Sequence, residues 1–277
     1  MPCIGLIHPG AMGASVGAAA RGNNHRVLWA SQGRSADTLA RAHRANLEDI
    51  GTVPQMVAVS DIILSVCPPH AAGDVARTVM ELGYAGIYVD CNAVSPQRTR
   101  AIQQIVEQAG ATYVDGGIIG GPAWKMEAGT HLYLSGQHAA EVAACFTDSP
   151  LRAPVLSDRI GAASAIKMGY AAYTKGTTAL LTAILGMVER EGVRIELQQQ
   201  WGETFSTQTI KRVCSNTAKA WRFEGEMYEI ADTFRDAGLP NGFHLAAAEI
   251  YKRLASFHED DATPPIEQVL AVLLGGE

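Results

Sequence analysis

The stretch Cys3-Ile4-Gly5-Leu6-Ile7-His8-Pro9-Gly10-Ala11-Met12-Gly13 joins a short apolar run to a glycine-containing turn, and the small residues Ala14–Ala20 that follow predict a helix. A strand, a tight turn and a helix in this order leave free backbone N–H groups at the helix N-terminus, where they can hold a pyrophosphate. His8 occupies the first position of the Gly-x-Gly-x-x-Gly pattern, whereas Gly10 and Gly13 keep the second and third. The pattern alone also fits a plain tight turn, but its place after the first strand favours a dinucleotide-binding site.

Short β-branched runs alternate with helical stretches through the first half of the chain, which is typical of a parallel α/β sheet. From Gly161 onward, helical periodicity dominates. We therefore expect an α/β fold in which a Rossmann-type doubly wound parallel sheet (residues 1–158) precedes an all-α domain (residues 159–277), as the length of 277 residues allows. The expected strands are Cys3–Ile7, Arg26–Trp29, Ile62–Val66, Ile87–Asp90, Thr112–Asp115 and His131–Ser135, and the expected helices between them are Met12–Arg21, Ser35–Ala45, Ala71–Leu82 and Pro96–Ala109.

The charge balance argues against a polyanionic partner. The chain has 22 Lys and Arg against 28 Asp and Glu, a net charge of −6. Such a chain lacks the basic footprint that nucleic acids and anionic membranes attract, so we expect neither as a partner. The apolar stretch Ala162–Val188 is expected to be a buried helix rather than a membrane span, because Lys167 and Lys175 interrupt it.

The N-terminus and the cysteines indicate a cytoplasmic protein. Met1-Pro2-Cys3-Ile4-Gly5 has no positively charged segment before its apolar run, so we expect no secretory signal. The cysteines are widely spaced without a Cys-x-x-Cys pair, which favours reduced thiols packed as small apolar residues. No set of His, Cys and carboxylates has metal-ligand spacing, so no metal is expected. The five cysteines are Cys3, Cys67, Cys91, Cys145 and Cys214.

The end of the second expected strand discriminates between the two nicotinamide cofactors. An Asp or Glu there binds the ribose hydroxyls of NAD, whereas cations and hydroxyls suit the 2′-phosphate of NADP. The segment Trp29-Ala30-Ser31-Gln32-Gly33-Arg34-Ser35 has no acid before Asp37. The sequence therefore predicts NADP, bound through Ser31 and Arg34. The alternative for Arg34 is a solvated charge at the start of a helix.

Four later segments, read together with Gly10-Ala11-Met12-Gly13, carry a likeness to a known family. They are Val66-Cys67-Pro68-Pro69, Asp90-Cys91-Asn92-Ala93-Val94-Ser95-Pro96, Asp115-Gly116-Gly117-Ile118-Ile119-Gly120-Gly121 and Gly161-Ala162-Ala163-Ser164-Ala165-Ile166-Lys167-Met168-Gly169-Tyr170-Ala171. With them the chain resembles the β-hydroxyacid dehydrogenase superfamily, which includes 6-phosphogluconate and 3-hydroxyisobutyrate dehydrogenases, over nearly its whole length. It looks most similar to a branch with a short, divergent helical C-terminal domain.

The resemblance implies roles for several residues. It places Lys167 on the catalytic lysine of the family, and Cys67 and Pro68 on a segment along the nicotinamide-side ribose. It places Gly120 and Gly121 where the family grips the substrate carboxylate. Two departures from the family pattern, Ile119 for Ser and Ala171 for Asn, imply that the substrate is not the usual carboxylate. The other departures are Asn92 and Ala93 for Ser and Thr, and Ala163 for Gly.

A lysine can act as a general base only if its pKa is lowered, and we expect burial among apolar neighbours to do this for Lys167. Lys167, Tyr170, Ala171 and Thr174 are predicted to share one helix face, because they lie at positions i, i+3, i+4 and i+7. Tyr170 is therefore predicted to donate a hydrogen bond to the substrate or to orient the lysine. The alternative is a lysine that reaches the surface and a tyrosine that packs in the core.

Other candidate residues each have a structural alternative. Asn92 follows a strand at the edge where doubly wound sheets bind ligands, but it could instead form a turn or cap the next helix. His8 lies beside the pyrophosphate position, although a satisfied loop histidine is the simpler interpretation. His244 follows a Gly-x-Pro break and could reach a cleft or a partner subunit, and Trp124 could line the mouth of the site or lie on the surface.

The sequence therefore predicts an NADP-dependent oxidoreductase that transfers a hydride between the nicotinamide and a small β-hydroxy acid or its keto form, with Lys167 as general acid/base. Two alternatives stay open: reduction of an imine or another carbonyl compound, and dinucleotide binding without catalysis. Ala162–Val188 is apolar around most of its circumference, so the helical domains are expected to pair as a homodimer. The predicted cofactor-binding residues are Gly10, Ala11, Met12, Gly13, Ser31, Arg34, Cys67, Pro68 and Asn92, the predicted substrate-binding residues are Asn92, Ala93, Gly120, Gly121 and Thr174, and the predicted catalytic residues are Lys167 and Tyr170.

Overall fold

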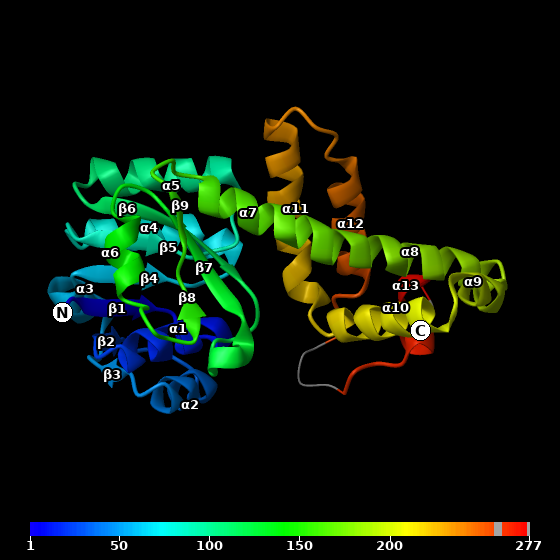
Figure 1. Cartoon of the computed structure of the whole chain (residues 1–277), viewed down its shortest axis with the longest axis horizontal. Coiled ribbons are helices and arrows are strands. Elements are labelled where there is room, and N and C mark those ends of the chain that lie inside the picture. Colours follow the sequence, from blue (N-terminus) through cyan, green and yellow to red (C-terminus); the bar gives the residue numbers. More distant parts are fainter. Residues whose placement is uncertain (258–261, 276–277) are drawn as a thin grey trace. The chain divides into compact units, whose positions relative to one another are not determined.

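The computed structural model describes residues 1–257 and 262–275, so residues 258–261 and 276–277 of the predicted second domain lie outside the described part. The chain divides into two compact units, Met1–Lys167 and Met168–Glu277 (Figure 1). The domain limits 1–158 and 159–277 stay a prediction. Within the described residues, no helix combines the length and the apolar composition that crossing a membrane requires.

The first unit is built on one mixed sheet with the strand order β3-β2-β1-β4-β5-β6-β7-β8, and β9 pairs with β7. All neighbours are parallel except β6 and β7, which are antiparallel. The predicted Rossmann-type sheet is therefore confirmed. The strands are β1 (Cys3–Ile7), β2 (Arg26–Trp29), β3 (Glu48–Asp49), β4 (Ile62–Ser65), β5 (Ile87–Asp90), β6 (Thr112–Ile119), β7 (Thr130–Ser135), β8 (Leu151–Arg152) and β9 (Val155–Ser157).

Helices cover both faces of this sheet (Figure 1). Buried residues of α1 and α6 pack into one apolar core, and buried residues of α3, α4 and α5 pack into another. Two buried layers explain why the strands read as nearly continuous apolar runs. The helices of the first unit are α1 (Ala11–Gly22), α2 (Ala36–Arg44), α3 (Val53–Val59), α4 (Ala72–Glu81), α5 (Pro96–Gln108), α6 (Ala139–Ala144) and the start of α7 (Ala162–Ala171).

Several elements differ from the sequence-based expectation. Strand β6 continues past Asp115 to Ile119, because its second half pairs with β7. The two-residue strands β3 and β8 are too short to show alternation. Helix α3 was not predicted, although Thr52 and Gln55 form a capping box at its start, a signal that the sequence does contain.

A buried carboxylate fixes the start of α7 on the sheet. Asp115 on β6 accepts hydrogen bonds from the backbone N–H groups of Gly161, Ala163 and Ser164 at 2.9 to 3.1 Å. The hydroxyls of Ser164 and Ser135 donate to the same carboxylate. The negative charge thus satisfies N–H groups that a helix cannot satisfy internally and lies at the positive end of the helix dipole.

Two glycines of β6 allow α7 to lie close to the strand. A Cβ atom on Gly117 would come within 2.5 Å of the Ala163 carbonyl oxygen and 3.0 Å of Lys167 Cβ. A Cβ atom on Gly116 would come within 3.0 Å of the Asp90 carbonyl oxygen. These glycines are therefore required for packing of the sheet and of α7.

The second unit is helical. The predicted continuous helix Ala162–Val188 is interrupted by a π-helical turn at Ala172–Gly176. Arg212 donates to the carbonyl oxygens of Tyr173 and Thr174 in this turn. The extra residue of a π turn rotates the residues after it about the helix axis, so the expected face cannot continue unchanged through Thr174. The later helices are α8 (Thr177–Arg190), α9 (Arg194–Trp201), α10 (Glu203–Thr217), α11 (Ala220–Asp236), α12 (Gly242–Arg253) and α13 (Ile266–Leu273).

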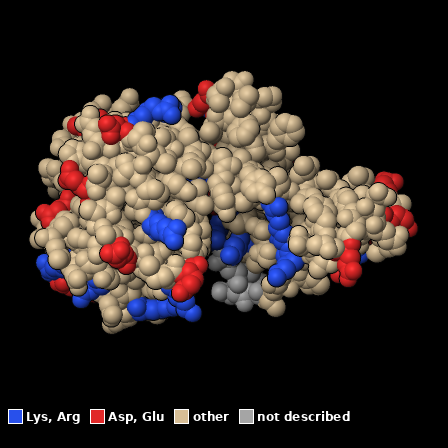
Figure 2. Space-filling view, viewed as in Figure 1, with Lys and Arg blue, Asp and Glu red and all other residues tan. Residues whose placement is uncertain are grey.

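The helical unit contains a partly buried ion pair. Lys175 Nζ pairs with Glu226 and lies 4.5 Å from the centre of the Phe223 ring. The Tyr251 hydroxyl donates to the Lys175 carbonyl oxygen at 2.7 Å. On the molecular face drawn in Figure 2, acidic and basic side chains are scattered in small groups over a mostly uncharged surface.

Replacing Gly117 by Ala tests the close approach of α7 to β6. Because the new methyl group meets backbone atoms, we expect Gly117→Ala to lower the free energy of unfolding by about 1 to 3 kcal/mol. Gly121→Ala is the matched control, since a Cβ atom there meets nothing within 4 Å. Urea unfolding measures both variants, and equal stability of the two would contradict the packing argument.

Candidate active site

Three segments meet at the carboxyl ends of neighbouring strands. The order of the sheet reverses between β1 and β4, and the loops after these strands are where doubly wound folds bind ligands. The Val66 N–H donates to the Ile7 carbonyl oxygen at 2.5 Å, and the His8 N–H donates to the Val66 carbonyl oxygen at 3.5 Å. The Cys67 N–H donates to Asn92 Oδ1 at 2.6 Å, which joins the loop after β5 to the other two.

The glycine loop leaves space at the N-terminus of α1. Gly10 is the N-cap of this helix, and a Cβ atom built on it meets nothing within 4 Å. A Cβ atom on Gly13 would collide with the His8 carbonyl oxygen, so Gly13 is needed for packing of the helix against the loop. The open side at Gly10 and the unpaired N–H groups of the first helical turn fit a pyrophosphate.

Arg34 is a half-buried cation beside the glycine loop. Its Nε atom is buried and has no hydrogen-bond partner among the residues that the structure describes. Burial lowers the pKa of Arg34, and burial together with the nearby Arg34 charge lowers the pKa of His8 to about 4. His8 is therefore neutral at pH 7. A buried guanidinium donor without a partner fits a phosphate group better than it fits a ribose hydroxyl.

An acid that the sequence pattern did not indicate lies beside the end of β2. Asp49 on β3 pairs with Trp29 in the parallel register, so it lies beside the segment that follows β2. Its Oδ1 atom accepts hydrogen bonds from the N–H groups of Gly51 at 2.8 Å and Ser31 at 3.2 Å. Partial burial raises the pKa of Asp49, but these hydrogen bonds outweigh it and the net pKa is lowered. The carboxylate thus holds the loop of Ser31.

Ser35 has a structural role in the same loop. Its hydroxyl is the N-cap of α2 and accepts a hydrogen bond from the Thr38 N–H. Ser31 and Ser35 are the two hydroxyl side chains of this loop. The geometry assigns Ser35 to capping.

Asn92 uses its side chain to join two strand ends. Its Oδ1 atom accepts from the Cys67 N–H, and its Nδ2 atom donates to Ser65 Oγ at 3.2 Å. The side chain is buried, and Ser95 rather than Asn92 caps α5. Cys67 itself is half-buried, and burial raises the pKa of its thiol to about 11. Asn92 therefore shapes the segment of Cys67.

Lys167 is tied to the sheet through its ammonium group. Its Nζ atom donates to the Ile118 carbonyl oxygen on β6 at 2.7 Å. The side chain is half-buried. The Asp115 contact fixes the start of α7, so the position of Lys167 relative to β6 follows from the helix geometry. The lysine thus lies at the end of β6, and the neighbouring strand β5 carries Asn92 just past its carboxyl end.

The connection after β6 is set by glycine geometry. Gly120 has φ +122, and a Cβ atom there would come within 2.9 Å of Thr130. The Gly121 carbonyl oxygen accepts from Thr130 Oγ1 at 2.7 Å. Ala123 and Trp124, which follow, contact α1 and α2. The Ala123 N–H donates to Ser15 Oγ, and the Arg44 guanidinium lies 4.4 Å from the centre of the Trp124 ring.

The remaining candidates lie in the helical unit. Tyr170 on α7 is 47% exposed, and the Thr174 hydroxyl donates to the Tyr170 carbonyl oxygen. Ala171 is buried. His244 packs against the Phe234 ring at 4.4 Å, and burial lowers its pKa. His244 is thus part of the interior of this unit.

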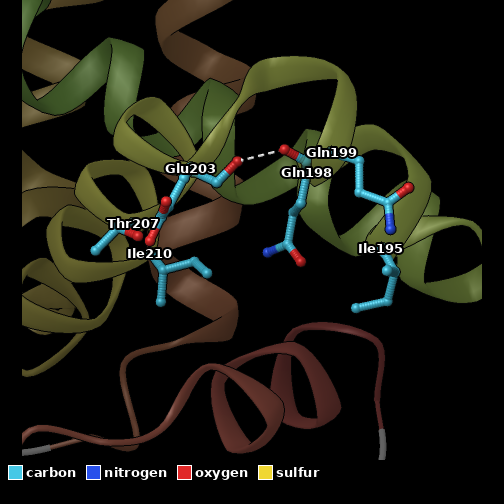
Figure 3. Close-up of a pocket in the computed structure, with 7 residues that line it drawn as sticks. Ile195, Gln198, Gln199, Glu203, Thr207 and Ile210 are labelled. Atoms are coloured by element: carbon cyan, nitrogen blue, oxygen red, sulfur yellow. Dashed lines mark hydrogen bonds between the residues drawn. The ribbon is translucent and has the colours of Figure 1, made fainter.

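A hollow of about 380 Å³ lies between α9 and α10 (Figure 3). The Ser206 hydroxyl donates to the Gln198 carbonyl oxygen at its wall at 2.7 Å. None of the predicted site residues lines it. The lining residues are Ile195, Gln198, Gln199, Glu203, Ser206, Thr207 and Ile210.

Residues 3–146 match the family model described as the NAD binding domain of 6-phosphogluconate dehydrogenase. The chain belongs to this family. Residues 189–254 match a domain of unknown function, DUF1932. The predicted resemblance to the β-hydroxyacid dehydrogenase superfamily is thereby confirmed, and the family supports a dinucleotide-dependent oxidoreductase.

Similar proteins agree with this family. An uncharacterized 28.5 kDa protein in the 7S RNA 5′ region of Methanothermus fervidus is 29% identical over 173 residues, which are 62% of this chain and 66% of that relative. A conserved protein described as structurally similar to 3-hydroxyacid dehydrogenases is 26% identical, with a TM-score of 0.67 over 91% of this chain and 96% of its own.

Two further solved structures share the fold. The 3-hydroxyisobutyrate dehydrogenase of Mycobacterium tuberculosis with L-serine has a TM-score of 0.69 at 18% identity, over 99% of each chain. An imine reductase variant from Myxococcus stipitatus with NAD+ has a TM-score of 0.53 at 19% identity, over 99% of each chain.

Within this family member, the structure brings part of the predicted site together. The glycine loop, Cys67 and Asn92 are joined by hydrogen bonds, and Arg34 lies beside the glycine loop. The roles of all the predicted site residues stay predictions. No group of His, Cys, Asp and Glu in the described ranges has an arrangement that could hold a metal ion.

The buried Asp90 and the half-buried His8 predict opposite dependences of stability on pH. Burial raises the pKa of Asp90 to about 7, and the nearby Asp115 charge adds to this effect. Between pH 4 and 7 the folded protein then holds a proton that the unfolded chain releases, so Asp90 makes the free energy of unfolding fall as pH rises. The lowered pKa of His8 has the opposite sign, because between pH 4 and 6.5 the unfolded chain binds the extra proton.

Urea unfolding of Asp90→Asn and His8→Gln between pH 4.5 and 6.5 measures these effects. The stability of the wild type relative to Asp90→Asn should fall with pH, by up to about 1.4 kcal/mol per pH unit. Its stability relative to His8→Gln should rise. Slopes of the same sign for both comparisons would contradict the assignment.

Proposed function

We propose that this protein is an NADP-dependent oxidoreductase that transfers a hydride between the nicotinamide and a small β-hydroxy acid or its keto form. The observation that carries the proposal is the position of Lys167, whose Nζ atom is held 2.7 Å from the Ile118 carbonyl oxygen at the end of β6. The family supports a dinucleotide, and a positioned lysine beside the carboxyl ends of the strands supplies an acid/base for alcohol and carbonyl chemistry.

Lys167 acts as the general acid/base in this proposal. When bound, NADP supplies the hydride acceptor, and NADPH the hydride donor. During reduction, the Lys167 ammonium donates a proton to the carbonyl oxygen of the substrate, and during oxidation its neutral amine removes the hydroxyl proton. The Ile118 carbonyl oxygen orients the ammonium group. Tyr170, three residues further along α7, donates a hydrogen bond to the substrate.

The preference for NADP rests on Arg34. Its buried Nε atom lacks a partner within the described ranges, and a 2′-phosphate would supply one. Asp49 beside the same loop already accepts hydrogen bonds from two backbone N–H groups. Its carboxylate is therefore less available to accept a hydrogen bond from a ribose hydroxyl of NAD. The pyrophosphate is assigned to Gly10, Ala11, Met12 and Gly13, the 2′-phosphate to Ser31 and Arg34, the nicotinamide-side ribose to Cys67, Pro68 and Asn92, and the substrate to Asn92, Ala93, Gly120, Gly121 and Thr174.

A second candidate function is reduction of an imine or of another carbonyl compound. Two positions favour it, because the family has polar substrate-binding residues there and this chain has the apolar residues Ile119 and Ala171. Ile119 is half-buried and Ala171 is buried, and neither can hydrogen-bond a carboxylate through its side chain. Binding of a dinucleotide without catalysis is the third possibility, and turnover measurements distinguish it.

Lys167→Met tests the catalytic assignment. We expect the variant to lose at least about 100-fold in kcat/KM with small β-hydroxy acids and keto acids, because the general acid/base is removed. Its dissociation constant for NADPH should change less than twofold. Lys211→Met, at an exposed position of α10, is the control. Full turnover by Lys167→Met would remove the assignment, and wild-type turnover of ketones or cyclic imines alone would favour the second function.

Arg34→Gln tests the choice of cofactor. Losing a hydrogen bond to a charged group should weaken NADPH binding by at least about tenfold and leave NADH binding nearly unchanged. Titration of nucleotide fluorescence measures both constants, with Arg21→Gln at the exposed end of α1 as the control. Equal weakening of NADPH and NADH would contradict a contact with the 2′-phosphate.

We also propose that the protein forms a homodimer through its helical unit. Leu180 and Met187, seven residues apart on α8, are 58% and 57% exposed. Large apolar side chains repeated on one helix face are typical of a surface that a second copy covers. Light scattering should therefore give twice the chain mass of 29.4 kDa, and Leu180→Glu should reduce it to one copy. A wild-type mass of 29.4 kDa at micromolar concentration would contradict the dimer.

A further inference from the structure

We infer that Arg41 is a positioning residue for the glycine loop, and that it supports binding of NADPH and NADH alike. It does so by holding the Pro9 carbonyl oxygen through a chain of hydrogen bonds that starts at the N-cap of α2. The inference rests on the proposed function in that both nucleotides are taken as ligands of this loop. Its role differs from that of Arg34, which selects between them.

The chain of hydrogen bonds joins the loop of residues 31–35 to the glycine loop. Ser35 Oγ accepts from the Thr38 N–H and lies 3.1 Å from Thr38 Oγ1. Arg41 Nη2 donates to Thr38 Oγ1 at 3.2 Å, and Arg41 Nε donates to the Pro9 carbonyl oxygen at 3.4 Å. Arg41 is half-buried, so these contacts are partly shielded from water.

Holding the Pro9 carbonyl oxygen fixes the direction of the next N–H group. The carbonyl of Pro9 and the N–H of Gly10 belong to one planar peptide unit and point in opposite directions. The Gly10 N–H donates to the His8 carbonyl oxygen at 2.8 Å. That oxygen is also the atom against which Gly13 packs so closely that a side chain would collide with it. Arg41 therefore anchors one side of a loop whose other side is anchored by α1.

Arg41 and Arg34 differ in whether their N–H groups already have hydrogen-bond acceptors within the described part of the protein. Arg41 uses Nε and Nη2 within the protein, whereas Arg34 has a buried Nε without a partner in the described residues. A donor already engaged by the protein preserves a conformation, and a donor without a partner is ready for a ligand. Loss of Arg41 should consequently weaken the binding of NADPH and of NADH by the same factor.

Arg44 provides a matched control on the same helix. It lies three residues beyond Arg41, carries the same charge and has its guanidinium 4.4 Å from the centre of the Trp124 ring. A change at Arg44 removes one positive charge from α2 and leaves the contact with Pro9 in place. It thus separates a general charge effect from the specific contact.

The experiment measures dissociation constants for NADPH and NADH by nucleotide fluorescence in the full-length wild type, Arg41→Gln, Arg41→Lys and Arg44→Gln. We expect Arg41→Gln to weaken both nucleotides about tenfold, with their ratio changed less than twofold. Arg41→Lys should be as weak, because an ammonium group cannot hold Pro9 and Thr38 in the geometry of a guanidinium. Arg44→Gln should change either constant less than twofold.

Amide hydrogen exchange of the nucleotide-free proteins gives a second readout. Exchange at residues 10–14 should be faster in Arg41→Gln than in the wild type, whereas exchange in α5 should not change. Wild-type affinity in Arg41→Lys would reduce the effect to charge, and loss of NADPH binding alone would make Arg41 a 2′-phosphate residue. Either result overturns the inference, as does unchanged exchange at residues 10–14. If the wild type binds neither nucleotide, the proposed function fails, and the exchange result alone decides the role of Arg41.

Discussion

The buried carboxylate of Asp115 is the interaction on which the arrangement of the candidate site depends. It accepts the backbone N–H groups that begin α7 and so starts this helix at one place on the sheet. Lys167 follows within the same helix and reaches the Ile118 carbonyl oxygen on the strand that carries Asp115. Gly117 lies between the two contacts and leaves the space that the helix needs. Strand β6 thus supplies the carboxylate that starts α7, the glycine that α7 packs against, and the carbonyl oxygen that binds Lys167.

A second constraint acts at the other end of the site, where cations gather in an acidic chain. The net charge is −6, yet Arg34, Arg41 and Arg44 follow one another in and before α2. Their contacts distribute them over different tasks: Arg41 holds the glycine loop, Arg44 lies on Trp124, and Arg34 keeps a buried donor without a partner in the described part of the chain. Arg34 and Arg41 lie at the glycine loop, and positive charge near an open helix N-terminus favours a ligand with several phosphates.

The strands and the glycine loop could be predicted from the sequence, because local residue patterns determine them. Each of the six expected strands corresponds to a strand of the sheet, and the glycine loop leads into α1 as expected. The sequence could not reveal Asp49 beside Trp29, because parallel pairing of β2 and β3 brings together residues far apart in the chain. The anchoring role of Asp115 likewise depends on contacts with residues more than 40 positions away. The π turn interrupts a stretch whose apolar periodicity looks continuous, and the donors to its carbonyl groups include the distant residues Arg212 and Tyr251.

A crystal structure of the protein with NADPH bound would show whether Arg34 and Lys167 have the proposed roles. We expect the 2′-phosphate on the guanidinium of Arg34, the pyrophosphate at the N-terminus of α1, and the Lys167 ammonium group beside the face of the nicotinamide ring that donates the hydride. A nicotinamide ring far from Lys167, or a 2′-phosphate without contact to Arg34, would contradict these roles.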